Sequence, residues 1–190
     1  AEITATREAL GWNHPPFEIP QEVYDGWRAI AARGSEAREA WSRRLFNSPN
    51  ADSFRAAHAP VDTQALDAAI CAYKHRLSED QPKVATRKAS EMALEIVNGT
   101  LPNTVGGSAD LTGSNNTKTK AQTPVKPGDY AGSYIHYGIR EHGMAAAMNG
   151  LALHGGLKPY GGTFLVFADY CRPAMRLSSL MGVPVVYVMT

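Results

Sequence analysis

Residues 133–150 decide the fold of this chain, and they read SYIHYGIREHGMAAAMNG. Residues 133–137 predict a strand, and the small and apolar residues of 140–154 predict a helix. One carboxylate, Glu141, stands where the strand turns into the helix, in the favourable field of the helix dipole. A carboxylate that faces a weakly basic ring nitrogen instead of water can hold or share a proton at neutral pH.

The residues that follow Glu141 are small. Gly143 and the run 145–147 leave a thin helix face, which favours close packing against a neighbouring surface. Burying an unpaired carboxylate in such a surface is costly. We therefore expect Glu141 to have a partner, which a protonatable aromatic nitrogen would supply. Taken alone, a glutamate at a helix start is more often a partner of the helix dipole or a solvated side chain.

The elements around this stretch alternate between helices and strands. We expect a helix over 85–97, a largely helical segment over 164–181 that Pro173 interrupts, and a buried parallel strand over 183–189. This alternation predicts an α/β fold, with a doubly wound, mostly parallel sheet and helices on both faces. The polar, turn-rich segment 109–132 is too irregular for a core element and long enough for a functional loop.

The first 58 residues form an arginine-rich segment without lysine. Helical spacing over 21–32 and 35–46, with Gly34 as a stop and Ser35 as a cap, predicts a helical hairpin. A second helical zone is expected over 59–80. The predicted organisation is therefore a helical linker over 1–58, followed by the α/β domain over 59–190.

Composition excludes several classes of protein. The formal net charge is +1, so neither a nucleic-acid footprint nor an acidic tail is indicated. No apolar run approaches the ~20 residues of a membrane span. The histidines show no metal-ligand spacing, so we expect no metal site within the chain. Cys71 and Cys171 lie far apart, which favours reduced thiols in a cytoplasmic protein.

Four motifs follow one another along the chain: ATRKASE at 85–91, GGSADLTGSN at 106–115, GIREHGM at 138–144 and GGTF at 161–164. Together they resemble the transketolase family, and the resemblance covers nearly the whole chain. It implies the thiamine diphosphate-binding fold, with 1–58 as the end of the diphosphate-binding domain or its linker. Residues 59–190 then form most of the pyrimidine-binding domain. The chain is therefore expected to be a truncated, central piece of such an enzyme.

The resemblance also implies roles for single residues. Glu141 matches the glutamate that hydrogen-bonds the aminopyrimidine ring nitrogen of thiamine diphosphate, and is the expected catalytic residue. The remaining cofactor-binding residues implied are Phe164, Phe167, Tyr170, Asp110 and Leu111. Without the motif, the spacing of the three aromatic residues would place them on one helix face and favour plain core packing.

Two further residues match contacts to the sugar phosphate. Arg87 carries a guanidinium, which gives directional, charge-assisted bonds to phosphate, and Ser114 adds a hydroxyl. Read without the family, Arg87 is more typical of a solvated charge at a helix end.

The implied activity belongs to a larger enzyme. It is the transfer of a two-carbon ketol unit from a ketose phosphate, such as xylulose 5-phosphate, to an aldose phosphate through a thiamine diphosphate adduct. The resemblance implies a homodimer with a composite active site. The Mg²⁺ ligands are expected outside this chain, because it carries no Gly-Asp-Gly motif with a downstream Asn. We therefore expect the chain alone to be inactive.

Three alternatives stay open. A related thiamine diphosphate enzyme, such as a dihydroxyacetone or deoxyxylulose phosphate synthase, would differ in the acceptor that it uses. A non-catalytic interaction module could keep the fold without the chemistry. A split enzyme would carry the other half of the site on a second polypeptide.

Overall fold

A parallel sheet of four strands organises the larger part of the molecule. The computed structural model describes residues 1–190, which form two compact units, Ala1–Asp52 and Ser53–Thr190. The strands of the second unit are β1 (Thr104–Ser108), β2 (Tyr134–His136), β3 (Lys158–Thr163) and β4 (Val186–Met189). They pair in the order β2-β1-β3-β4, and every pairing is parallel.

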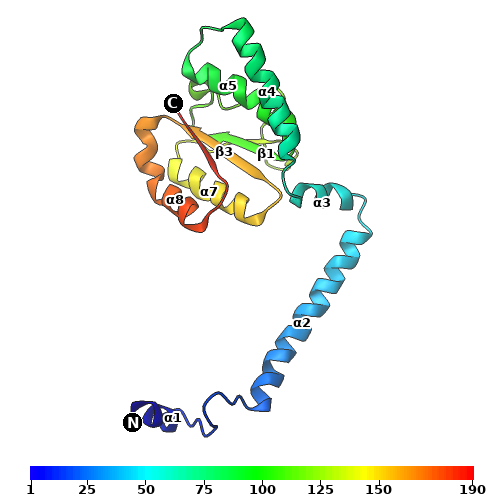
Figure 1. Ribbon diagram of the computed structural model, residues 1–190, viewed down its shortest axis with the longest axis vertical. Helices are drawn as coiled ribbons and strands as arrows, with labels where there is room; N and C mark the ends of the chain where they lie inside the picture. The colour runs from blue at the N-terminus through cyan, green and yellow to red at the C-terminus, as the bar shows by residue number, and fades with distance from the viewer. The chain divides into compact units, whose positions relative to one another are not determined.

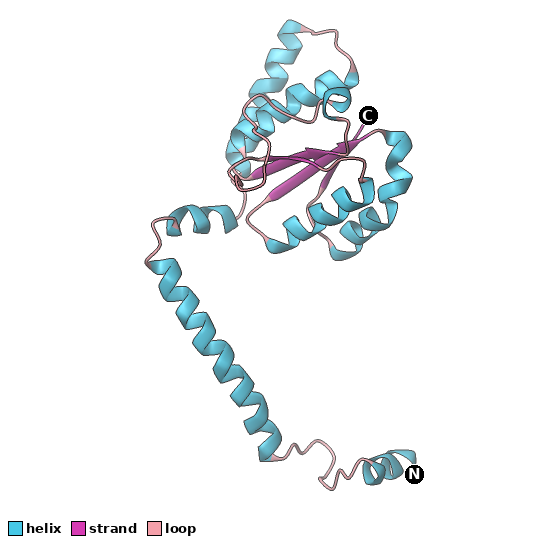
Figure 2. Cartoon of the chain, turned by 180° about the vertical axis from the view of Figure 1, so that it is seen from behind, coloured by secondary structure: helices cyan, strands magenta, loops and turns pink.

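Helices cover both faces of this sheet (Figure 1). Helices α7 (Glu141–His154) and α8 (Ala168–Met181) pack against each other on one face. Helices α4 (Thr63–Asp80) and α5 (Thr86–Thr100) lie on the other, as the reverse view in Figure 2 also shows. The doubly wound, mostly parallel α/β fold expected from the sequence is therefore confirmed.

Adjacent glycines in β3 allow close approach on both faces of the sheet. A Cβ added at Gly161 would lie 2.6 Å from Sδ of Met148, on α7. A Cβ added at Gly162 would lie 2.5 Å from Cγ2 of Thr117, in the segment between β1 and β2. Met148 and its neighbour Met144 are fully buried, so β3 and α7 form the centre of the core.

The first unit contains one long helix where the sequence predicted a helical hairpin. Helix α1 spans Glu2–Ala9, and α2 runs unbroken over the 26 residues Gln21–Phe46. Glycine inside a helix costs only ~1 kcal/mol relative to alanine, which the helix-forming residues around Gly34 offset. The Ser35 hydroxyl donates to the Glu39 carboxylate at 3.4 Å and does not cap a new helix. None of the helices combines the length and hydropathy needed to cross a membrane.

Several element boundaries also differ from expectation. Helix α3 (Ala51–His58) was not predicted, and α4 begins only at Thr63, after Asp62 accepts a capping hydrogen bond from the Ala65 amide at 3.1 Å. Helix α8 continues through Pro173 without interruption. Strand β4 lies at the edge of the sheet, paired only with β3, so Val186 is exposed where a buried strand was expected.

The segment 109–132 is irregular, as expected, but part of it lies in the core. It contains a short helix, α6 (Thr112–Asn115), and its buried polar side chains are those of Asn115, Thr117, Thr119 and Gln122. The Tyr160 hydroxyl accepts from Nδ2 of Asn98 at 2.9 Å and lies 2.8 Å from two acceptors, the Thr117 carbonyl and Oε1 of Gln122. A polar segment can thus be core when its hydrogen bonds are satisfied internally.

Replacing Tyr160 by phenylalanine should lower the free energy of unfolding by about 1–3 kcal/mol, because it leaves buried polar partners unsatisfied. Denaturant unfolding of the wild type and of Tyr160→Phe would measure the change in the free energy of unfolding. Tyr130→Phe is the matched control, since the Tyr130 side chain is exposed and should tolerate the same chemical change. An equal effect at both positions would contradict the role given to the buried hydroxyl.

Candidate functional site

A cavity of about 530 Å³ opens beyond the carboxyl ends of three strands. Its lining residues are Asp110, Leu111, Ile139, Glu141, Phe167 and Tyr170. The first pair follows β1, the second pair follows β2, and the two aromatic residues follow β3. Ligands of open parallel sheets bind at this edge. The cavity thus brings together five residues that the sequence predicted as cofactor-binding, from segments far apart in the chain.

Glu141 is held by a tight turn after β2. Gly138 adopts a φ of +69°, and the Arg140 amide donates to the Gly138 carbonyl at 2.8 Å. The Arg140 guanidinium donates to the Tyr137 carbonyl at 2.9 Å, so it is directed back onto the turn. Glu141 is the first residue of α7, as the sequence predicted to within one residue, and is partly buried. Its carboxylate accepts no hydrogen bond from the chain and is therefore available to a ligand.

The turn after β1 places Asp110 and Leu111. Asp110 has a φ of +61°, in the left-handed region that few non-glycine residues adopt. The Ser108 hydroxyl fixes this turn, because it donates to the Gly162 carbonyl and accepts from the Leu111 amide, both at 3.1 Å. The Asp110 side chain is exposed toward solvent, so its charge lies at the mouth of the cavity.

The three predicted aromatic residues form a row. The ring centroids of Phe164 and Phe167 lie 5.9 Å apart, and those of Phe167 and Tyr170 lie 6.1 Å apart. They do not share one helix face, because Phe164 precedes the 3₁₀ helix η1 (Leu165–Phe167) and Tyr170 lies in α8. Phe167 and Tyr170 line the cavity, whereas Phe164 lies outside its lining and reaches it only through its ring contact with Phe167.

Arg87 and Ser114 lie outside the lining of this cavity. Arg87 is exposed in the first turn of α5, and its guanidinium forms no ion pair. Ser114 lies on α6, four residues after Asp110, and is partly buried. Their side chains are thus on the two segments that flank β1 in the sequence, and the guanidinium is free to bind an anion.

Ile139 is a lining residue that the sequence reasoning missed. It is 79% exposed, although it is large and apolar. The available signal was its position: a branched apolar residue in the turn between Gly138 and Glu141, where polar residues are usual.

Burial governs the titration of two groups near the site. It raises the pKa of Tyr137 to about 12, since that ring packs against the core cluster of Met144 and Met148. The pKa of the Cys171 thiol is also raised, first by burial and then by the negative charge of Glu141. Cys171 therefore lies within electrostatic reach of the Glu141 carboxylate.

The raised pKa of Tyr137 predicts a loss of stability at alkaline pH. Below about pH 10 the phenol is neutral in the folded and unfolded chain, whereas between 10 and about 12 only the unfolded chain ionises. Raising the pKa of Tyr137 from 10.0 to about 12 corresponds to about 3 kcal/mol of unfolding free energy. Stability should therefore fall less steeply in this range for Tyr137→Phe than for wild type, in denaturant titrations at each pH. Parallel profiles would contradict the assignment.

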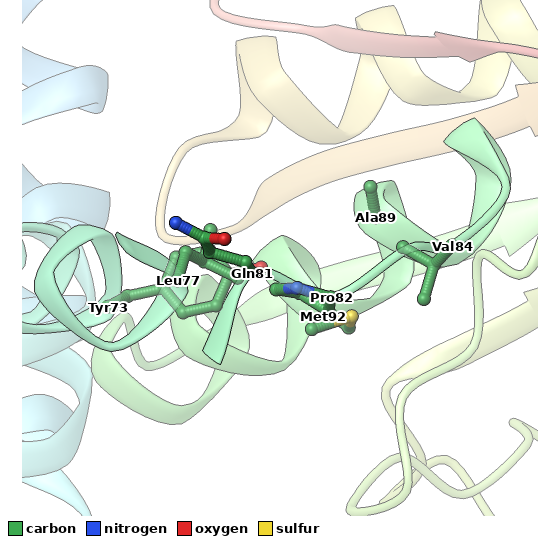
Figure 3. A pocket seen from close by; sticks show the side chains of 7 residues that line it. All are labelled: Tyr73, Leu77, Gln81, Pro82, Val84, Ala89 and Met92. Carbon is green, nitrogen blue, oxygen red and sulfur yellow. The ribbon is translucent and has the colours of Figure 1, made fainter. Parts of the chain in front are cut away.

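A second cavity, of about 420 Å³, lies between α4, the turn after it and α5 (Figure 3). Its lining residues are Tyr73, Leu77, Gln81, Pro82, Val84, Ala89 and Met92. It holds none of the predicted site residues and no charged side chain. It therefore does not suit a charged cofactor or a sugar phosphate.

Comparisons with known proteins relate this chain to transketolases. Residues 82–190 match the family model for the transketolase pyrimidine binding domain, and residues 1–66 match that for the transketolase thiamine diphosphate binding domain. The whole chain is 69% identical to a transketolase of Cereibacter sphaeroides and 56% identical to one of Sinorhizobium medicae. It spans 29% and 27% of the length of these two relatives.

Solved structures show the same relationship. A transketolase of Campylobacter jejuni matches with a TM-score of 0.73 at 28% identity, over 95% of this chain and 27% of its own. A transketolase of Pichia stipitis, solved in complex with sedoheptulose 7-phosphate, matches with a TM-score of 0.69 at 33% identity, over 95% of this chain and 28% of its own.

Proposed function

This chain belongs to the transketolase family, and from that premise we propose that its cavity holds the pyrimidine ring of thiamine diphosphate in a transketolase. The larger enzyme would transfer a two-carbon ketol unit from a ketose phosphate, such as xylulose 5-phosphate, to an aldose phosphate. The observation that carries this proposal is the convergence of Glu141, Asp110, Phe167 and Tyr170 on one cavity.

The lining of the cavity fits an aminopyrimidine ring. Phe167 and Tyr170 offer apolar faces for a flat ring. Glu141 offers a carboxylate that accepts no hydrogen bond from the rest of the chain. No basic residue lines the cavity, so a diphosphate would have to be held elsewhere. When bound, thiamine diphosphate supplies the carbon nucleophile that cleaves a ketose next to its carbonyl.

Glu141 would hold or share a proton at the ring nitrogen. Its place at the first residue of α7 puts it in the field of the helix dipole, and the turn through Gly138 fixes its direction. The Phe167 and Tyr170 rings would exclude water from the ring faces, which strengthens the carboxylate–nitrogen hydrogen bond. Asp110, at the mouth, would offset positive charge on the cofactor, with Leu111 beside it as an apolar wall.

Arg87 and Ser114 would bind the phosphate of the sugar. The unpaired guanidinium of Arg87 can form two parallel hydrogen bonds to phosphate oxygens, and the Ser114 hydroxyl can add a third. Both lie outside the cavity lining, as expected if the sugar carries its phosphate away from the reacting carbon.

The exposed apolar side chains around the cavity support a composite site in a homodimer. Ile139, Leu165, Val166 and Tyr170 are between 65% and 79% exposed in this chain. A second subunit would cover them and supply the residues for diphosphate and Mg²⁺. The free thiols of Cys71 and Cys171 suit a cytoplasmic enzyme.

A panel of donors and acceptors tests the proposed reaction with the full-length protein. Transfer from xylulose 5-phosphate to ribose 5-phosphate supports transketolase. Preference for formaldehyde as acceptor would favour a dihydroxyacetone synthase, because that product is one carbon larger than the ketol unit. Use of pyruvate as donor would favour a deoxyxylulose phosphate synthase, since the product keeps a methyl group. No turnover with any pair would overturn the proposal.

A further inference from the structure

The Thr163 hydroxyl is buried without a hydrogen-bond partner. Thr163 is the last residue of β3, its exposed fraction is 0%, and its Oγ1 atom meets no donor or acceptor. An unsatisfied buried hydroxyl is uncommon in folded proteins and costs stability. Its position, directly before the aromatic row, is next to the candidate site.

The strand register shows which face of the sheet Thr163 occupies. Thr163 is paired with Met189 of β4, and residues paired across parallel strands point to the same face. Met189 packs against the cluster formed by Ala145 of α7 with Cys171 and Ala174 of α8. The Thr163 side chain therefore faces α7 and α8.

The same geometry places Thr163 level with the start of α7. Gly161, two residues before it, faces Met144 and Met148 of α7. Strand β3 advances ~7 Å from Gly161 to Thr163. Helix α7 joins the parallel strands β2 and β3 and so runs antiparallel to them. Toward the N-terminus of α7, the distance along the helix axis from the level of Met144 and Met148 to Glu141 is a similar ~7 Å.

Glu141 and Thr163 each lack a hydrogen-bond partner that the other could supply. The Glu141 carboxylate accepts no hydrogen bond within the chain, whereas the Thr163 hydroxyl has no acceptor. Cys171, which belongs to the cluster that Met189 contacts, experiences the charge of Glu141. The unpaired Thr163 hydroxyl and the unpaired Glu141 carboxylate thus lie at the same end of the layer between the sheet and helices α7 and α8.

We propose that Thr163 is a positioning residue, whose hydroxyl donates a hydrogen bond to the Glu141 carboxylate when the cofactor fills the cavity. Oγ1 is sealed from solvent, so a molecule in the cavity does not reach it directly and the contact runs through a protein group. If a ligand nitrogen bonds one oxygen of the Glu141 carboxylate, the second oxygen is left in a site without water. This second oxygen then needs a hydrogen-bond donor from the protein. The inference rests on the proposed function of the cavity.

Two substitutions at Thr163 test this role in the full-length protein. Thr163→Val keeps the shape and removes the hydroxyl, whereas Thr163→Ser keeps the hydroxyl. Without cofactor, Thr163→Val should melt at the wild-type temperature or above, because an unpaired buried group is lost. Its dissociation constant for thiamine diphosphate should rise about 10-fold or more, which is the expected effect of losing a hydrogen bond to a charged group. Thr163→Ser should keep wild-type affinity.

A double-mutant cycle with Glu141→Ala identifies the partner. If Thr163 acts through Glu141, Thr163→Val should have little further effect on cofactor affinity once the carboxylate is gone. Wild-type affinity in Thr163→Val, a lower melting temperature without cofactor, or an undiminished effect in the Glu141→Ala background would each overturn the inference. Failure of the wild-type protein to bind thiamine diphosphate would instead overturn the proposed function.

Discussion

Replacing Glu141 by glutamine is expected to slow ketol transfer by about 10²- to 10⁴-fold, the usual contribution of a positioned acid–base group. The amide keeps the size of the side chain but does not hold or share a proton at the ring nitrogen. Stability should change little, since Glu141 is only partly buried and makes no hydrogen bond within the chain. Steady-state rates of the full-length protein at saturating thiamine diphosphate would measure the loss.

The control for this experiment is Glu22→Gln. Glu22 also lies in the first turn of a helix, α2, but it is exposed and distant in sequence from the cavity residues. If Glu141 were only a partner of the helix dipole, both substitutions would cost ~0.3–1 kcal/mol of stability and leave the rate unchanged. That outcome would contradict an acid–base role for Glu141 in ketol transfer.

Replacing Arg87 by alanine should raise KM for the sugar phosphate by about 10- to 100-fold, as expected for the loss of hydrogen bonds to a charged group. The kcat at saturating sugar should change much less, because the guanidinium binds the phosphate and not the reacting atoms. Thermal unfolding should be unaffected, since the side chain is exposed and unpaired. Initial rates over a range of xylulose 5-phosphate concentrations would separate the two constants.

Two comparisons sharpen the result for Arg87. Arg87→Lys keeps the charge but loses the two-pronged geometry, so its KM should lie between those of wild type and Arg87→Ala. Arg176→Ala removes an exposed arginine of α8 and should leave KM unchanged. Equal effects at positions 87 and 176 would point to general electrostatic attraction instead of a phosphate contact.

The sequence predicted the elements that depend on local pattern. The strand before Gly138 and the helix that begins at Glu141 were both anticipated, because the residue types change there within a few positions, from aromatic and branched to small and apolar. The long α2 was missed, because a glycine-serine pair ends a helix only if the chain then turns away. The low helix propensity of Gly34 predicts a stop at this position, but the helix-forming residues around it outweigh that propensity.

The buried part of segment 109–132 shows a second limit. Asn115 and Thr117 read as loop residues, since polarity is normally a sign of exposure. Their burial depends on partners distant in the sequence: Thr117 Oγ1 lies 2.8 Å from the Tyr134 hydroxyl, and the Thr117 carbonyl faces Tyr160. Such long-range hydrogen bonds leave no local pattern in the chain.

The cavity itself was predictable only through the family resemblance. The topology brings Asp110 and Tyr170 to one cavity from the ends of two strands, and no spacing rule connects residues so far apart. The motifs likewise did not predict that Arg87 lies outside the lining of the cavity. Local pattern places a side chain on its element, whereas strand order decides which elements meet.

The most direct measurement is a crystal structure of the full-length protein with thiamine diphosphate bound. We predict that the pyrimidine ring lies against Phe167 and Tyr170, with its ring nitrogen within hydrogen-bonding distance of the Glu141 carboxylate. A cofactor bound elsewhere, or a pyrimidine ring with Glu141 still turned to solvent, would contradict the account.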